Sequence, residues 1–139
     1  YIFNIIFYAS LHFFNHIGQV EEMERCIKDD IKDVRFIPYI QLHEFEALLF
    51  ASNEGFNSFF DEIQKEKAQQ IINSYDNPED INTTPEGAPS KRILAIKEDY
   101  DKVLEGNLIA LEIGFSKIME KCTRFRAWIE KLIKLCKES

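Results

Sequence analysis

Apolar residues follow two different rhythms along this chain of 139 residues. Residues 1–8 and 35–42 form nearly continuous apolar runs, which is typical of buried β-strands, and Pro38 favours an edge position or a bulge for the second run. Elsewhere the apolar residues recur every three or four positions, which indicates amphipathic helices. The pattern therefore predicts an α/β fold that is mostly helical, with short strands near the amino end followed by a helical carboxyl-terminal half.

The predicted helices span residues 19–31, a segment that begins at Glu44, and residues 91–96, 107–121 and 124–136. Ser90 can cap the helix that follows it. Residues 73–89 contain three of the four prolines, which predicts a loop longer than the usual length of roughly four to six residues. The length fits a single domain over residues 1–139. Because Tyr1 already lies in an apolar run, we expect the carboxyl-terminal part of a longer protein.

The formal net charge is −7, which argues against broad, sequence-independent binding of DNA but leaves room for a local basic patch. Cys26, Cys122 and Cys136 form no paired motif, so we expect a reduced cytoplasmic protein with buried thiols and no zinc site. The first twenty residues carry no charge but include polar residues, so we expect neither a signal peptide nor a membrane segment. An uncharged first strand is also compatible with a homo-oligomer.

His43, Glu44 and Glu46 interrupt an apolar block where the predicted strand gives way to a helix, a common place for chemistry in α/β proteins. Two residues that are two positions apart share one side of a strand but point to different sides of a helix. Glu44 and Glu46 can therefore share a metal ion only if the backbone is still extended there. In the alternative, His43 or Glu44 caps the helix and Glu46 faces solvent. The zinc-protease pattern H-E-x-x-H is rejected because Ala47 occupies the place of its second histidine.

Ser90, Lys91 and Arg92 stand at the predicted start of a helix, where backbone N–H groups, a hydroxyl and two cations can bind a phosphate or a nucleic-acid backbone. In the alternative, Ser90 is a simple cap, and Arg92 is solvated or pairs with Glu79. The third candidate is a basic stretch between Lys121 and Lys137. Such a run of charges is more typical of a solvated helix face.

Several blocks together resemble the bacterial family known as domain of unknown function 4276. These blocks are Arg35–Phe50, Pro78-Glu-x-Ile-Asn82, Ala88-Pro-Ser-Lys-Arg-Ile93, Tyr100-x-Lys102 and Cys122-x-x-Phe125-x-x-Trp128. The resemblance implies a Toprim-like fold, similar to topoisomerases and overcoming-lysogenization nucleases. It also implies a magnesium-dependent nuclease subunit that acts with an SMC-like or ABC-like ATPase in restriction or phage defence.

If the resemblance holds, Glu44 and Glu46 are the candidates for the Mg²⁺ site and for catalysis, with His43 polarising the site. Ser90, Lys91 and Arg92 would bind a phosphate, while Glu79 and Asn82 would support the site.

The sequence departs from the family pattern in two ways. The acidic motif of the family lies upstream and is not in this chain, and Phe7 stands where the family carries an acidic residue before Tyr8. The metal site would therefore be incomplete, because Mg²⁺ needs several oxygen ligands. The alternative is a non-catalytic interaction module that docks an ATPase partner or its own upstream half. Convergence of the candidates on one open cleft would favour a catalytic site, whereas a buried pair of Glu44 and Arg92 would favour scaffolding.

Overall fold

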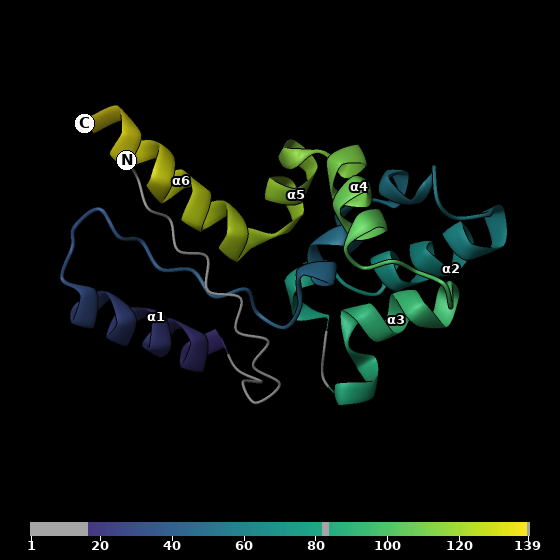
Figure 1. The fold of residues 1–139 in the computed structure, drawn as a ribbon, viewed down its shortest axis with the longest axis horizontal. Coiled ribbons are helices and arrows are strands. Elements are labelled where there is room, and N and C mark those ends of the chain that lie inside the picture. The colour runs from purple at the N-terminus through teal and green to yellow at the C-terminus, as the bar shows by residue number, and fades with distance from the viewer. Residues whose placement is uncertain (1–16, 82–83, 139) are drawn as a thin grey trace.

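The computed structural model describes residues 17–81 and 84–138, which form helices, turns and extended segments (Figure 1). The α-helices are α1 (Ile17–Ile31), α2 (Glu62–Asn73), α3 (Pro89–Ile96), α4 (Leu104–Ile113), α5 (Phe115–Lys121) and α6 (Thr123–Glu138). Four short 3₁₀ helices accompany them: η1 (Phe45–Ala51), η2 (Asn53–Phe56), η3 (Pro78–Asp80) and η4 (Pro85–Gly87). These residues contain no strand, so the prediction of an α/β fold is wrong for them. The first predicted strand, residues 1–8, lies outside the described residues.

The second predicted strand, residues 35–42, starts in a turn at Arg35, ends in a bend at Leu42 and has no regular secondary structure between them. Side chains from two helices bind its backbone instead. The carboxylate of Glu24 on α1 accepts a hydrogen bond from the Ile40 N–H at 2.7 Å. From α6, the guanidinium of Arg124 donates to the Ile40 carbonyl at 3.1 Å, and the indole of Trp128 donates to the Ile37 carbonyl at 3.0 Å. The segment is apolar because Ile40 and Leu42 are buried, and burial alone does not require a sheet.

The main hydrophobic core surrounds η1, where every residue from Glu46 to Ala51 is buried. Helices α2 to α5, η2 and the segments that connect these elements contribute the rest of this core, which includes Phe56, Phe60, Ala68, Ile81, Ile93, Ile109, Ile113, Ile118 and Cys122. Figure 1 shows α2, α3 and α4 together on one side of the molecule and α1 and α6 on the other. The central position of η1 explains why the apolar quartet from Ala47 to Phe50 is continuous rather than periodic.

A second, smaller core lies beside α1, where Val20 packs with Ile40 and Leu42. An ion pair between Glu24 and Arg124, at 2.8 Å, links α1 to α6. On α6, Trp128 stacks on Tyr39 with ring centroids 4.9 Å apart. The part of the described structure around this smaller core therefore relies on polar and aromatic contacts more than the part around the main core does.

Helix boundaries agree with the sequence predictions to within two residues at α1, α3 and α6 and differ at α4 and α5. The predicted helix 107–121 is divided at Gly114, whose φ of 78° lies in the left-handed region that favours glycine. The predicted Ser90 cap is also wrong. Helix α3 begins at Pro89, one residue before Ser90, because proline suits the first helical position. The residue in the cap position is Ala88.

The cysteine prediction is partly confirmed, since Cys122 is buried whereas Cys26 and Cys136 are exposed, and all three are free thiols. Among the described residues, no helix combines the length and apolar character needed to cross a membrane.

Gly55 lies where η2 meets α4, and a side chain there would overlap that helix. A Cβ at Gly55 would lie 2.8 Å from the Ile109 carbonyl oxygen and would collide with the side chain of Ile113. We expect Gly55→Ala to lower the free energy of unfolding by about 1–3 kcal/mol, as overpacking usually does. Gly18→Ala is the control, because nothing lies within 4 Å of its added Cβ in α1. Urea denaturation should show a loss for Gly55→Ala alone; equal effects would contradict this packing.

Candidate functional site

The backbone turns sharply at His43, between the segment 35–42 and η1. His43 has a φ of 66°, a left-handed conformation that is uncommon for residues other than glycine. Glu44 then returns to an extended conformation, with φ −122° and ψ 157°, and η1 begins at Phe45. Glu44 and Glu46 are therefore not on one continuous strand, which is what a shared metal ion would require from this spacing.

The carboxylate of Glu44 binds the amino end of another helix. Its Oε2 accepts a hydrogen bond from the backbone N–H of Ser90 at 2.8 Å. Ser90 is the second residue of α3, and the partial positive charge at a helix amino end stabilises a carboxylate there. The capping alternative for Glu44 is thus close to the observed structure, although the helix that it caps is α3 rather than the one that follows it.

Glu46 is fully buried, with 0% of its residue surface exposed, so the expectation that it faces solvent is wrong. The ammonium of Lys102 lies 3.0 Å from Glu46 Oε1, and the Lys102 side chain is 57% exposed. The angles of this contact are not those of a hydrogen bond, and neither carboxylate oxygen accepts a hydrogen bond from residues 17–81 or 84–138. Glu46 is therefore a buried charge compensated mainly by one exposed cation.

Tyr100 lies near enough to this buried carboxylate to feel its charge, and Gly106 lies against the Tyr100 hydroxyl. The Tyr100 hydroxyl is buried and has no hydrogen-bond partner in the described part of the chain. Burial, followed by the charge of Glu46, raises the pKa of Tyr100 well above its ordinary value of 10, so the phenol stays neutral. Gly106 on α4 provides room for it, since a Cβ there would lie 2.6 Å from the hydroxyl oxygen. A neutral hydroxyl, a carboxylate and an ammonium therefore share one largely buried region.

Glu79 is the second buried carboxylate, with 1% of its surface exposed, and it is fully bonded. Its two oxygens accept hydrogen bonds from the backbone N–H groups of Arg124 at 2.8 Å and Phe125 at 3.1 Å, at the amino end of α6. The Tyr39 hydroxyl donates to the same carboxylate at 3.3 Å. Glu79 therefore caps α6, and Asn82, which was predicted to support the site together with Glu79, lies outside the described residues.

The Ser90–Arg92 corner holds the preceding loop in place. Arg92 donates from Nε to the Gly87 carbonyl at 2.7 Å and from a terminal nitrogen to the Tyr75 hydroxyl at 3.1 Å. Its guanidinium also lies 5.5 Å from the centroid of the Tyr75 ring. The predicted pairing of Arg92 with Glu79 is replaced by these contacts, and Lys91 is exposed.

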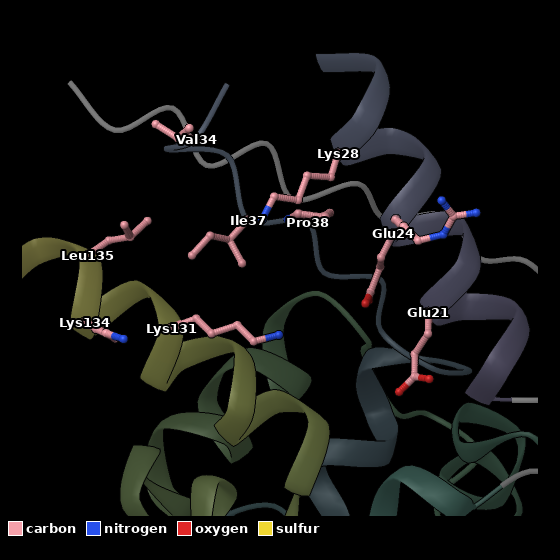
Figure 2. A pocket seen from close by; sticks show the side chains of 10 residues that line it. Glu21, Glu24, Lys28, Val34, Ile37, Pro38, Lys131, Lys134 and Leu135 are labelled. Carbon is pink, nitrogen blue, oxygen red and sulfur yellow. The ribbon is translucent and has the colours of Figure 1, made fainter. Parts of the chain in front are cut away.

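The three predicted carboxylates make separate contacts in the described residues. Glu44 accepts a hydrogen bond from α3, Glu46 lies beside Lys102, and Glu79 accepts hydrogen bonds from the amino end of α6. Figure 2 shows a cleft elsewhere, between α1 and α6, with Glu24, Ile37 and Lys131 among its lining residues. None of the predicted site residues lines that cleft.

The predicted magnesium site also fails a test on these contacts. Mg²⁺ requires a near-octahedral set of oxygen ligands, whereas the oxygens of Glu44 and Glu46 face a backbone N–H and an ammonium. No three His, Cys, Asp or Glu side chains within residues 17–81 and 84–138 are grouped so as to hold a metal ion. The described residues by themselves do not fit a magnesium centre.

Comparison with protein families agrees with the sequence blocks that hold these contacts. The family model for the domain of unknown function DUF4276 matches residues 5–133. The chain belongs to the DUF4276 family. Comparisons with curated proteins and with solved structures gave no match. The family resemblance is therefore confirmed, and the family description itself assigns no activity.

Several important residues of this DUF4276 chain had no role in the sequence predictions. Tyr100 and Lys102 were visible as part of a family block, but their proximity to Glu46 has no local sequence signal. The same holds for Arg124, which links Glu24 and Ile40 across the chain. Asn77 had a clearer signal: before a proline it is a favoured cap, and its side chain does accept the Glu79 N–H at 2.9 Å.

His43 is half-buried, and its burial lowers its pKa below the ordinary value of 6.5, while the charges of Asp80 and Glu44 act in the opposite direction. A histidine with a lowered pKa favours the neutral form in the folded state. Its contribution to stability is therefore complete above about pH 6.5 and is lost as the pH falls towards the folded pKa.

We expect this pH dependence to disappear in His43→Asn, since asparagine tolerates the left-handed backbone and does not titrate. The free energy of unfolding of the DUF4276 chain should fall more steeply than that of His43→Asn between about pH 7 and pH 5. The other histidines are present in both proteins, so the difference isolates His43. A constant difference in the free energy of unfolding between the two proteins across this range would show that folding does not change the pKa of His43.

Glu79→Gln should destabilise the protein by about 1–3 kcal/mol, because an amide nitrogen cannot accept a hydrogen bond from the amino end of α6. Asp80→Asn is the matched control, with the same chemical change at the exposed neighbouring residue. Urea denaturation followed by fluorescence of Trp128, the single tryptophan, reports directly on α6. Equal stability of the two variants would rule out the capping role of Glu79.

Proposed function

We propose that the described helices of this DUF4276 chain serve as an interaction module that positions a partner and does not itself carry out a reaction. The observation that carries the proposal is the bonding of Glu79 to the amino end of α6. That carboxylate has three protein donors and is buried, so its acceptors are used for holding the fold. Glu44 is used in a similar way at α3.

The partner that we propose is an ATPase subunit, as the family resemblance implies, or an upstream segment of the same protein. Two observations support a binding role. The contacts of Glu44, Glu79 and Arg92 hold helices and a loop in fixed positions, which keeps the outer surfaces rigid. Several large apolar side chains on α4 are exposed on such a surface, and exposed apolar patches usually mark interaction sites.

The second candidate function is a Toprim-like magnesium-dependent nuclease acting on nucleic acid in restriction or phage defence. Glu46 is the observation that favours it. A buried carboxylate without hydrogen bonds costs stability, and such a group often has a functional reason. A nuclease of this kind would require further carboxylates from outside the described residues, because Glu46 alone cannot hold Mg²⁺.

Cleavage of plasmid DNA by the full-length protein distinguishes the two functions. The assay contains Mg²⁺ or Mn²⁺, with and without an ATPase subunit, and compares Glu44→Ala and Glu46→Gln with the unchanged protein. If the chain is an interaction module, we expect both variants to bind the ATPase subunit as the unchanged protein does. Any cleavage of DNA by the complex should then be the same in both variants as in the unchanged protein, at temperatures below their melting temperatures. Glu44→Ala should lower the melting temperature, because α3 loses its cap.

Glu98→Gln, a change at an exposed residue, controls for the general effect of removing one negative charge. A metal-dependent cleavage that falls at least about tenfold in Glu46→Gln, but not in Glu98→Gln, would overturn the interaction-module proposal. That result would assign Glu46 to the nuclease. Failure of the protein to bind an ATPase, combined with absence of cleavage, would contradict both candidates.

A further inference from the structure

Helix α4 is apolar on two opposite sides. Ile109 and Ile113 on one side are buried in the main core, with 0% and 4% of their surfaces exposed. Leu104 and Leu111 on the other side are 61% and 76% exposed, and Leu108 is 38% exposed. A helix that is apolar all round is normally buried on all sides. The described residues cover only one side of α4.

The exposed leucines have the spacing of a helix–helix interface. Leu104, Leu108 and Leu111 are separated by four and then three residues, as in the apolar seam of two packed helices. We call these three leucines the α4 face. Figure 1 shows α4 beside α5.

The charges beside the α4 face are mainly acidic. Asp101 and Glu112 are exposed near its two ends. The nearby Lys102 places its ammonium 3.0 Å from the buried Glu46, and this pairing reduces its effect on the outer surface. The whole chain also has a net charge of −7. A second copy would bring further negative charge to this surface, whereas a basic partner would be attracted to it.

We infer that the α4 face binds an amphipathic helix of a partner protein, one whose apolar row is flanked by Lys or Arg. This inference rests on the proposed interaction-module function and names the surface and the chemistry of its partner. Binding of an amphipathic helix through regularly spaced apolar anchors is a common mode of recognition. The leucines supply the apolar contact, and the acidic residues select the charge of the partner.

The probe is a synthetic helical peptide of about 21 residues, three heptads, with leucine along its apolar row and lysine on both flanks. The comparison peptide carries glutamate in place of the lysines. Fluorescence anisotropy measures their binding to the unchanged protein, to Leu104→Gln/Leu111→Gln and to Ile63→Gln. Ile63 is a matched control, because it is 66% exposed and belongs to α2 rather than to α4.

We expect the lysine peptide to bind at least about tenfold more tightly than the glutamate peptide, and the double variant to lose at least about tenfold in affinity. Ile63→Gln should bind like the unchanged protein. All three proteins should have the same melting temperature, because the altered side chains are exposed. Equal binding of both peptides, or equal binding by the double variant, would overturn the inference.

A second copy is the competing occupant, and analytical ultracentrifugation tests it. A dimer of the unchanged protein that is lost in Leu104→Gln/Leu111→Gln would replace the partner helix by a second copy and overturn the inference. If neither peptide binds while the full-length protein still binds an ATPase subunit, only the inference about the α4 face is wrong. Failure of the unchanged protein to bind an ATPase subunit would contradict the proposed function itself.

Discussion

The carboxylate of Glu79 is the contact on which half of the described structure depends. It lies in η3, caps α6 through Arg124 and Phe125, and approaches the Tyr39 hydroxyl. The Arg124 side chain continues from α6 to Glu24 on α1. One buried charge therefore helps to place α1, α6 and the segment 35–42 between them. Its desolvation is offset by charge-assisted hydrogen bonds and by the helix amino end.

Glu46 is the other buried glutamate, and its contacts differ from those of Glu79. Both carboxylates are buried, but among the described residues Glu79 accepts three hydrogen bonds, whereas Glu46 accepts none and pairs with the exposed Lys102. The fold gains the arrangement of α6 from Glu79 and gains no comparable contact from Glu46. Natural proteins usually tolerate such a local cost at functional positions. This contrast makes Glu46, rather than Glu44, the residue of the original trio that most needs a functional explanation.

The helices were predictable where periodicity is local and strong, as the agreement at α1 and α6 shows. The segment 35–42 was misassigned because an apolar run reports burial and cannot report what binds the backbone. Here the binding groups are Glu24, Arg124 and Trp128, which lie far away in the sequence. The break in the predicted helix 107–121 did have a signal, since Gly114 can adopt a left-handed backbone that other residues avoid.

The contacts of the predicted site residues had no local sequence signal for a related reason, because each family-like block supplies one end of a contact whose other end is in another block. Glu44 in the first block binds Ser90 in the third, and Glu79 in the second binds Arg124 and Phe125 in the last. Glu46 likewise meets Lys102 from the fourth block. Residues that recognise one another in this way identify a fold. These contacts are consistent with the family membership of the chain but do not specify its chemistry. A function must therefore be sought in groups that the contacts leave unexplained, which are the carboxylate oxygens of Glu46 and the exposed leucines of α4.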